Sequence, residues 1–458
     1  MSTKKTADGA SAAEPLTTDP ATERMTPQAK SAAKGAWFGL FVDYFDIYLP
    51  IVALAPALGY FMAADLSATE ATTFGFALFA AAFLGRPIGT FVFGHLGDKI
   101  GRKRTTLIAA GGVTVTTFLV GALPGYAVAG VWALILLPLL RLVGGVFMGG
   151  QYTSANPLAI EGAPRRLRGQ VGGIIAGAYP LAYVAISLVT FALMRMLNGS
   201  NATGPYQQWG WRIPFVIGGV LSLCFFFYYR KEVQESAVWE EARKSGQKST
   251  GSPLKTLFSG ENRKALIQVF VLMTGLWFGI QILTSATPTL LISYFKLPGQ
   301  SVTWGLLIAN VVLAVAYPLC GLLGQRFGRR RMLSIAGVGT VTLSAGLYWL
   351  MISVVSGGGS LPLTILLVGL CLVITVAPNA MIVAYLCERF PTNVRSSGYG
   401  IGYTVAVVIP SFYSAIMLQL GEVMSYRHVP VLLLVVAGVL TFVGARMGPE
   451  TNKVSMDD

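Results

Sequence analysis

The stretch GHLGDKIGRKR at residues 94–104 occurs a second time, as GLLGQRFGRRR, at residues 321–331. In both copies glycines, which permit tight turns and close helix approach, end an apolar run and precede a cluster of basic residues. A second pair of motifs, EGAP to RG at residues 161–169 and ERFP to RS at residues 388–396, has the same separation of 227 residues. Two unrelated motifs with one separation indicate that the chain contains a duplicated half.

The composition around these motifs is that of a chain that sits in lipid. Of the 458 residues, 54% are hydrophobic and 12% are charged, whereas soluble domains carry roughly 25% charged residues. A spanning helix needs about 20 mostly apolar residues. Such runs cover residues 35–60, 71–94, 105–124, 131–154, 170–193, 213–230, 265–287, 301–324, 332–355, 361–383, 396–419 and 428–447. Because these runs are too long for barrel strands, we expect an all-α membrane protein with twelve transmembrane helices.

The repeat divides this chain into two expected six-helix bundles, at residues 35–230 and 265–447. The charged stretch at residues 231–264 is expected to be a cytoplasmic linker between them. Residues 1–34 are polar and lack the apolar core of a signal peptide, which predicts a disordered N-terminal tail. Residues 448–458 are expected to form a C-terminal tail.

The basic residues predict the orientation in the membrane. If the N-terminus is cytoplasmic, the inside segments hold 28 of the 34 Lys and Arg residues, and the outside loops hold Arg195, Arg212, Lys296 and Arg427. The positive-inside rule therefore predicts cytoplasmic termini in a multi-pass protein, which we expect in a bacterial inner membrane. The net charge of +14 is spread over short loops rather than over one face, so no nucleic-acid partner is expected.

Several motifs together suggest a family. The stretch at residues 94–104 resembles the signature loop of the major facilitator superfamily. Four other stretches resemble its metabolite–proton symporters, the group that includes 2-oxoglutarate, citrate, shikimate and proline/betaine symporters. They are FLGRPIG at 83–89, Arg141 with glycines at 144, 145, 149 and 150, WGWRIPF at 209–215 and ERFPT at 388–392. The first helix, with VDYFDIY at 42–48, and Gln151, which stands where the group has Glu, depart from it.

This resemblance implies a mechanism and a latch. Two bundles would rock about a central site and expose it to each side in turn. In the family the signature loop holds the bundles together at the cytoplasmic side, and Asp98 would contact a helix N-terminus of the other half. The expected latch residues are Gly94, Asp98, Arg102, Glu161, Arg168, Arg329, Glu388 and Arg395. Gln325 replaces the aspartate in the second copy, which predicts a weaker contact there. The alternative is that the basic loop only anchors a helix end.

Charged side chains at membrane depth cost on the order of a few kcal/mol each, so they indicate transport pathways or fixed partners. Four are clear, and all belong to the N-terminal half: Asp43, Asp46, Arg86 and Arg141. The aspartates share one helix face at a spacing of three residues. Matched depths favour pairing of Asp43 with Arg86 and of Asp46 with Arg141.

We expect Asp43 and Asp46 to couple transport to protons, because the proton affinity of a carboxylate depends on its burial and on nearby arginines. Asp46 is the preferred carrier, and the alternative is a permanent structural ion pair. Arg86 and Arg141 are expected to bind an anionic substrate, since arginine matches a carboxylate in bidentate geometry. Neutral residues would complete the pocket: Tyr44, Tyr48, Gln151, Tyr152, Tyr179, Trp277, Gln281, Asn310, Asn379 and Tyr403.

The sequence therefore predicts a monomeric, proton-coupled symporter that takes up a small organic anion. The four cysteines lack a paired spacing, and no motif suggests a metal site, a cofactor, a nucleotide or a catalytic nucleophile. Three alternatives stay open: an antiporter or exporter, a symporter of a zwitterionic or neutral metabolite, and a membrane sensor without net flux. The helix at residues 170–193 matches the glycine–proline pattern of antiporters poorly.

Overall fold

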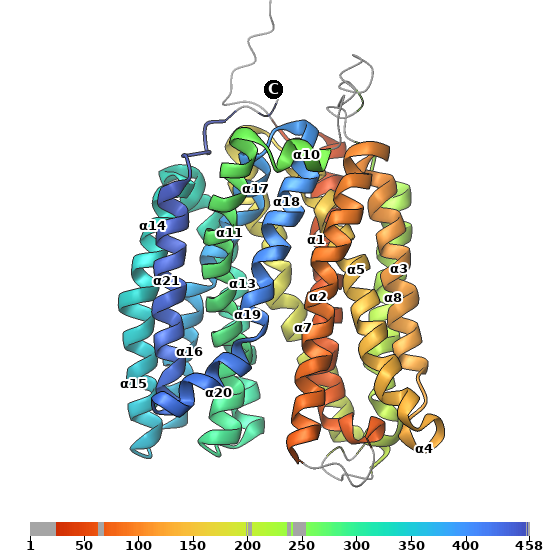
Figure 1. Cartoon of the computed structure of the whole chain (residues 1–458), viewed down its shortest axis with the longest axis vertical. Coiled ribbons are helices and arrows are strands. Elements are labelled where there is room, and N and C mark those ends of the chain that lie inside the picture. Colours follow the sequence, from red (N-terminus) through yellow and green to blue (C-terminus); the bar gives the residue numbers. More distant parts are fainter. Residues whose placement is uncertain are drawn as a thin grey trace, which may run out of the picture.

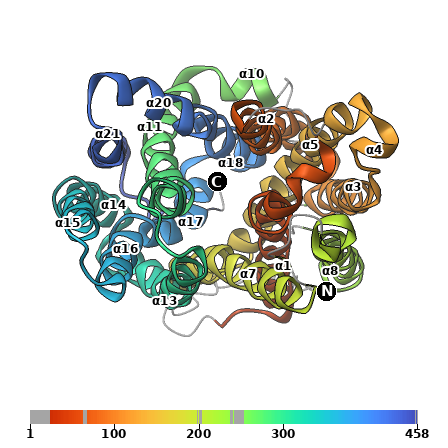
Figure 2. The same ribbon diagram turned by 90° about the horizontal axis from the view of Figure 1, so that it is seen from below.

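The computed structural model describes residues 24–62, 68–197, 199, 204–235, 240, 253–454 and 456; for residues 68–73, 76, 77, 79 and 253 it describes the backbone alone. Two helical bundles lie side by side and run in the same direction (Figure 1; Figure 2 shows them from below). Within the described residues, eleven spans are long and apolar enough to cross a membrane. With α2 they give twelve spans, and the predicted all-α membrane fold is confirmed.

The first bundle occupies the N-terminal half. Its helices are α1 (Pro27–Tyr48), α2 (Ala68–Ile100), α3 (Arg102–Ala122), α4 (Tyr126–Ala129), α5 (Val131–Glu161), α6 (Arg168–Ala176), α7 (Ala178–Met196) and α8 (Arg212–Glu232). Four shorter segments link or extend them: η1 (Leu49–Leu54), η2 (Ala55–Phe61), η3 (Arg165–Leu167) and η4 (Tyr206–Gly210).

The second bundle begins with α10 (Pro253–Leu257) and α11 (Gly260–Gln281). It continues with η5 (Ile282–Ala286), α12 (Thr287–Thr289), η6 (Leu290–Tyr294), α13 (Gly299–Phe327), α14 (Arg329–Gly339), η7 (Thr340–Ser344) and α15 (Ala345–Ser356). The remaining elements are α16 (Leu361–Thr375), η8 (Ala377–Met381), α17 (Ile382–Arg389), η9 (Thr392–Val394), α18 (Arg395–Thr404), η10 (Val405–Val407), α19 (Val408–Ser411), α20 (Tyr413–Val423), η11 (Tyr426–His428) and α21 (Val429–Met447).

The first helix begins earlier than the sequence predicts. The Thr26 side chain accepts a hydrogen bond of 3.1 Å from the Ala29 backbone N–H, and Pro27 occupies the first helical turn. A capping hydroxyl followed by proline is a strong helix start. The predicted polar tail at residues 1–34 therefore extends too far, and its residues 1–23 lie outside the described chain. Residues 236–239 and 241–252 of the predicted linker also lie outside it, and the domain division stays a prediction.

The two halves repeat the same backbone geometry at the signature loop. Gly101, before α3, has φ +106°, and Gly328, before α14, has φ +96°. Glycine adopts this region without the strain that a Cβ would bring. The equivalence, 227 residues apart, supports the duplication that the motifs predict.

Small residues bring α2 and α5 together inside the first bundle. A Cβ added at Gly85 would lie 2.9 Å from the Val146 backbone nitrogen, and one added at Gly145 would lie 2.9 Å from the Ala82 carbonyl carbon. Such close backbone approach is typical of membrane helix pairs. It fixes the relative positions of the arginines that these two helices carry.

Prolines interrupt the helices next to the interface between the bundles. Pro50 lies in η1, Pro378 lies in η8, and Pro288 lies in α12 between two π segments. Proline removes a backbone donor, and the helix locally changes its winding. Broken helices are where membrane transporters build their substrate sites.

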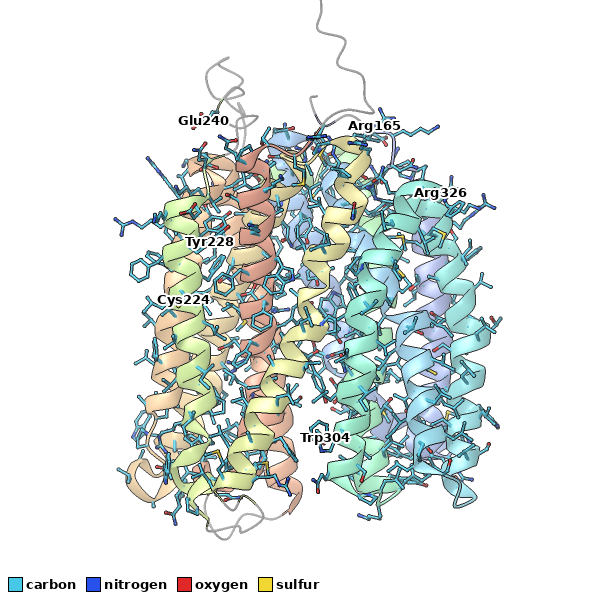
Figure 3. The ribbon with its side chains drawn as sticks, turned by 180° about the vertical axis from the view of Figure 1, so that it is seen from behind. Arg165, Cys224, Tyr228, Glu240, Trp304 and Arg326 are labelled. Atoms are coloured by element: carbon cyan, nitrogen blue, oxygen red, sulfur yellow. The ribbon has the colours of Figure 1, made fainter. Side chains whose placement is uncertain are left out.

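Charged side chains gather at one end of the molecule. Figure 3 shows Arg165, Glu240 and Arg326 near the end at which α1 begins and α21 finishes, whereas Trp304 lies toward the opposite end. We call these the basic end and the far end.

Candidate functional site

Asp46 and Arg141 form a buried ion pair in the first bundle. An Arg141 guanidinium nitrogen lies 2.6 Å from one Asp46 carboxylate oxygen, and the other guanidinium nitrogen donates to the Asp46 backbone carbonyl at 3.0 Å. The Thr117 hydroxyl donates to the second carboxylate oxygen at 2.6 Å. Both charged side chains are 3% exposed. The pair thus joins α1, α3 and α5, and Asp46 has no free oxygen.

Asp43, one turn nearer the basic end, lies in a different environment. Its side chain is fully buried, and neither carboxylate oxygen has a hydrogen-bond partner among the described residues. Arg86 is close enough to interact with it electrostatically. The expected direct ion pair between them is absent from the described contacts, because Arg86 instead lies between two aromatic rings. Its guanidinium carbon is 5.2 Å from the Phe83 ring centre and 5.5 Å from that of Tyr152.

Aromatic side chains close the seam between the bundles beside these charges. The hydroxyls of Tyr44 and Tyr403 lie 2.9 Å apart and share a hydrogen bond. The Trp277 indole N–H donates to the Tyr403 carbonyl at 2.9 Å. The rings of Tyr152 and Tyr403 are 5.4 Å apart, and those of Tyr44 and Tyr179 are 4.8 Å apart. The structure therefore brings five of the predicted pocket residues together. We call this cluster the plug; it consists of Tyr44, Tyr152, Tyr179, Trp277 and Tyr403.

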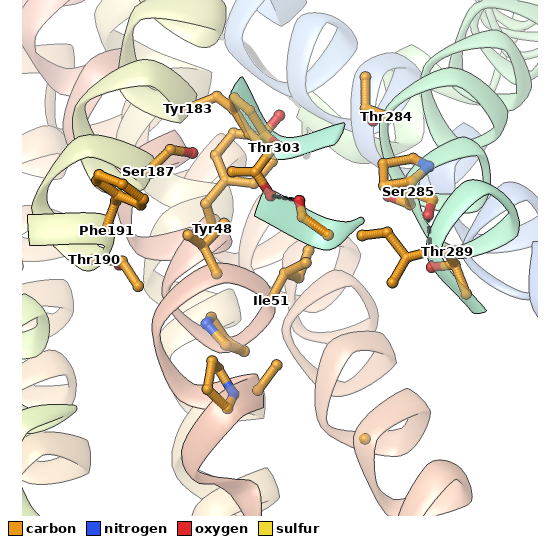
Figure 4. A pocket seen from close by; sticks show the side chains of 18 of the residues that line it. Tyr48, Ile51, Tyr183, Ser187, Thr190, Phe191, Thr284, Ser285, Thr289 and Thr303 are labelled. Carbon is orange, nitrogen blue, oxygen red and sulfur yellow. Dashed lines mark hydrogen bonds between the residues drawn. The ribbon is translucent and has the colours of Figure 1, made fainter. Parts of the chain in front are cut away.

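A cavity of about 930 Å³ lies on the far-end side of this plug. Figure 4 shows its walls: Ser187, Thr190 and Phe191 on one side, Thr284, Ser285 and Thr289 on the other, and Tyr48 between them. The lining extends to Arg195 near the end of α7 and to Gln300 and Thr303 near the start of α13. Because these helix ends belong to the far end, the cavity opens there.

Tyr48 is the one predicted substrate residue among the described side chains that line this cavity. Three of the amides are bonded to backbone carbonyls instead: Gln151 to Gly39 at 3.1 Å, Asn310 to Leu306 at 2.9 Å and Asn379 to Val376 at 3.0 Å. The Gln281 amide nitrogen is buried and has no described partner. In this conformation these residues lie behind the cavity surface, and their substrate role stays a prediction.

Sequence reasoning missed the hydroxyl residues that form the cavity walls. Tyr183, Ser187, Thr190 and Arg195 all line the cavity from α7. The spacing of four and then three residues from Tyr183 through Ser187 to Thr190 marks one helix face. This polar stripe on an otherwise apolar helix was a signal that could have identified that wall.

The basic end is closed by bonds between the bundles. Asp98, at the end of α2, accepts hydrogen bonds from the Ser397 hydroxyl at 2.7 Å and from the Ser397 backbone N–H at 3.2 Å. The equivalent Gln325 accepts from the Gly169 backbone N–H at 2.9 Å. Each acceptor thus meets the N-terminal turn of a helix in the opposite bundle, where N–H groups are unpaired.

Ion pairs surround these contacts. Within each half an arginine of the signature loop pairs with the glutamate of the second motif, Arg102 with Glu161 and Arg329 with Glu388. All four side chains are at most 2% exposed. Glu161 also pairs with Arg395 of the other bundle. Seven of the eight predicted latch residues form a hydrogen bond or an ion pair at or near this seam. The eighth, Gly94, packs against Ser397.

The residues after α21 extend across the same seam. The Glu450 carboxylate accepts from the Arg329 backbone N–H at 2.7 Å and from the Arg330 backbone N–H at 3.1 Å, both in its own bundle. The Arg168 guanidinium, in the first bundle, donates to the Val454 carbonyl at 2.9 Å. The C-terminal segment therefore contributes a further link, which the sequence did not reveal.

Together these features describe a chain whose two bundles enclose a cavity that is open at one end and closed at the other. A family model described as the Major Facilitator Superfamily matches residues 36–415. The chain belongs to the Major Facilitator Superfamily. It is a membrane transporter rather than an enzyme, and the predicted family is confirmed.

Its similarity to known members of the superfamily extends along most of the chain. It is 32% identical to the inner membrane metabolite transport protein YhjE of Escherichia coli strain K12, over 81% of this chain and 83% of that relative. It is 28% identical to the shikimate transporter of the same organism, over 83% of this chain and 85% of the relative. The solved proton:xylose symporter XylE shares 17% identity and a TM-score of 0.77, covering 95% of this chain and 98% of XylE, which shows the fold.

Proposed function

We propose that this major facilitator protein is a proton-coupled symporter that takes up a small organic anion by alternating access, working as a single chain. One observation carries the proposal: beneath the plug, an acid and a base, Asp43 and Arg86, are both buried, and the described contacts include no direct ion pair between them. Burying a charge without a partner is costly. A proton on Asp43 and a substrate carboxylate at Arg86 would remove both costs.

The proposed orientation places the basic end in the cytoplasm. The placement of 28 of the 34 Lys and Arg residues in the inside segments supports it. The cavity then opens to the outside, and the bonds around Asp98 and Glu161 close the inside. The described conformation corresponds to the state that receives substrate from outside.

For the proton carrier, the geometry favours Asp43 over Asp46 in this conformation. One carboxylate oxygen of Asp46 is paired with Arg141, and the other accepts a hydrogen bond from Thr117. Protonation of Asp46 must therefore first break one of these contacts. Asp43 can take up a proton without losing a bond. In this proposal the Asp46–Arg141 pair holds α1, α3 and α5 together while Asp43 is loaded.

The substrate class rests on the sign of the available charges. The described residues around the cavity and plug offer Arg86 and Arg195, and no lysine. Guanidinium groups bind carboxylates in bidentate geometry. The shikimate transporter among the relatives supports an organic acid as cargo.

One rival function has an observation in its favour. Asp43 in its ionised form and Arg86 together would complement a zwitterion, whose ammonium would approach the carboxylate. Such a substrate needs no proton on Asp43. The two proposals therefore differ in the effect of a pH gradient.

The deciding experiment is uptake into proteoliposomes of labelled shikimate, 2-oxoglutarate, proline, glycine betaine and xylose, with and without an inward proton gradient. We expect concentrative uptake of one of the two acids, abolished by a protonophore. Asp43→Asn should lose gradient-driven accumulation but retain counterflow exchange. Concentrative uptake of a zwitterion alone, or unchanged gradient-driven accumulation by the Asn variant, would contradict the proposal.

A further inference from the structure

Polar side chains of the two bundles meet at a buried contact between the plug and the basic end. The Asn156 amide N–H, on α5, donates to the Tyr399 hydroxyl, on α18, at 2.8 Å. The hydroxyls of Thr90, on α2, and Thr404, on α18, are hydrogen-bonded at 3.2 Å. We call this cluster the polar contact; its members, each at most 1% exposed, are Thr90, Thr153, Asn156, Tyr399 and Thr404.

The polar contact lies one helical turn from the plug. Asn156 follows Tyr152 of the plug by four residues on α5, and Tyr399 precedes Tyr403 of the plug by four residues on α18. Each therefore lies about 6 Å further toward the basic end. A substrate that leaves the Arg86 region for the basic end must pass this level, and opening of that end must break the Asn156–Tyr399 bond.

The repeat supplies an internal comparison for this contact. The positions 227 residues from Asn156 and Tyr399 are Val383 and Gly172. A Cβ added at Gly172 would lie 3.5 Å from the Val383 Cβ, so the same two positions also meet between the bundles in the other copy, without polar side chains. The remaining equivalents are Tyr317 for Thr90, Ala380 for Thr153 and Gly177 for Thr404.

The polar contact leaves hydrogen-bonding capacity unused. The Asn156 side-chain oxygen is buried and has no partner among the described residues, and none of the hydrogen bonds described there uses the Tyr399 O–H as donor. Unsatisfied buried polar groups are unfavourable. Closure alone does not need them, since the other copy closes with glycine against valine. These groups are therefore suited to a ligand that binds when the bundles separate.

The chemistry of the polar contact fits a carboxylic acid. The Tyr399 O–H and the Asn156 N–H groups can donate to a carboxylate, and the Asn156 oxygen can accept from a hydroxyl of the same molecule. None of the five side chains is charged. Hydrogen bonds from neutral donors are weaker than those from a guanidinium, so a carboxylate would be held less tightly here than at Arg86. A weaker site nearer the basic end favours release.

We propose that the polar contact is an inner binding site, uncovered when the basic end opens, that holds the carboxylate of the transported acid after it leaves Arg86. This inner site rests on the proposed function and deepens it by naming where the acid binds before release. The acid leaves along α5 and α18, because the equivalent contact of α6 and α17 offers it glycine and valine.

The first test locates the bound acid with two matched thiols. Thr153→Cys places a thiol in the inner site, and Ala380→Cys places one at the equivalent position, both in a protein whose four native cysteines are replaced by alanine. Inside-out membrane vesicles present the basic end to methyl methanethiosulfonate, a neutral reagent, with or without shikimate or 2-oxoglutarate. A saturating concentration of the transported acid should slow the reaction about fivefold or more at position 153 and less than about twofold at position 380.

The matched thiols separate occupancy of the site from a change of conformation. An acid that only closes the basic end protects both thiols alike, whereas an acid in the inner site shields position 153. Equal protection at the two positions, or none at position 153, would overturn the inner site.

The second test removes one hydrogen-bond donor by adding Tyr399→Phe to Thr153→Cys. Because this change also breaks a bond that closes the basic end, the acid concentration that gives half protection is multiplied by the fraction of open molecules. Spin labels at Arg165→Cys and Arg326→Cys in a parallel sample measure that fraction. The product is the dissociation constant of the open form, and it should rise about fivefold or more.

The control for this variant is Tyr348→Phe, whose hydroxyl bonds to Thr287 within the second bundle. It should leave the dissociation constant of the open form unchanged. The same constant in Tyr399→Phe and the parent would show that the Tyr399 hydroxyl serves closure alone, and the inner site would be wrong.

Uptake by the parent protein tests the proposed function separately. If the parent accumulates one of the acids but the two thiols are protected equally, the proposed function stands and the inner site fails. If the parent transports neither acid, the proposed function fails and the inner site fails with it.

Discussion

The hydroxyls of Tyr44 in α1 and Tyr403 in α18 join the two bundles through a hydrogen bond of 2.9 Å. The bond lies within the plug, behind the cavity surface and beside the rings of Tyr152 and Tyr179. It can exist only while the bundles are in contact at this depth. If the two bundles separate at the plug so that the basic end opens, the Tyr44–Tyr403 hydrogen bond must break.

Tyr44→Phe should shift the conformational equilibrium toward opening of the basic end. A net hydrogen bond contributes about 0.5–1.5 kcal/mol, which corresponds to about a twofold to twelvefold change in the ratio of closed to open molecules. Distances between spin labels at Arg165→Cys and Arg326→Cys, exposed positions in opposite halves, report this ratio.

The matched control is Tyr348→Phe. The Tyr348 hydroxyl bonds to Thr287 at 3.0 Å within the second bundle, so its loss should not change the distance between the labels. Equal shifts in both variants would contradict a specific role for the Tyr44–Tyr403 bond.

Asp46→Asn should destabilise the protein far more than Asp43→Asn. Removal of one partner from a buried ion pair costs about 3–5 kcal/mol, and Asp46 has such a partner in Arg141. Asp43 makes no described hydrogen bond, so the amide costs little there. Thermal unfolding in detergent measures both variants, and an equal loss of Tm would show that Asp43 is bonded after all.

A comparison of Glu161→Gln with Glu388→Gln should distinguish an effect on contact between the bundles from an effect on the stability of each half. The two glutamates are equivalent in the repeat, and each pairs with an arginine of its own half. Glu161 also forms a direct salt bridge with Arg395 of the other bundle, whereas Glu388 interacts electrostatically with Arg168 of the other bundle. Both variants should lower Tm, but Glu161→Gln, which removes a direct salt bridge between the bundles, should lengthen the distance between labels at residues 165 and 326 more than Glu388→Gln does. A similar lengthening in Glu388→Gln would argue against an inter-bundle latch at Glu161.

Gly85→Ala should destabilise the first bundle, because the added Cβ would meet the backbone of α5 near Val146. Overpacking of this kind costs about 1–3 kcal/mol. Gly346→Ala is the control, since a Cβ there meets nothing within 4 Å, and alanine favours a helix over glycine by roughly 0.5–1 kcal/mol. The Tm should fall in the first variant and stay or rise in the second; a fall in both would show that the backbone approach is not the cause.

Much of the fold was predictable because lipid imposes strict rules on sequence. Apolar runs of about 20 residues predict spanning helices, and the glycine–arginine loops predict the repeat. The contacts of Asp98 and Arg395 with the opposite bundle followed from the family resemblance. The start of α1 at Pro27 was missed, because the polar residues before the apolar run concealed a capped first turn.

The candidate site was less predictable. Matched depth along two helices suggested that Asp43 pairs with Arg86 as Asp46 pairs with Arg141. Depth is set by residue number, whereas pairing also depends on how each helix is rotated about its axis. The aromatic rings of Phe83 and Tyr152 occupy the contact positions around Arg86.

The sequence by itself determined the membrane fold, the duplication and the family, because hydrophobic length and motif spacing are local properties of the chain. Only the tertiary structure decided which side of the plug is open, which aspartate has both carboxylate oxygens bonded, and that residues of α7 and of the segment 284–303 line one cavity. Those features depend on the packing of helices that are far apart in the sequence. A shift of the two bundles by a few ångströms changes them without changing a single residue.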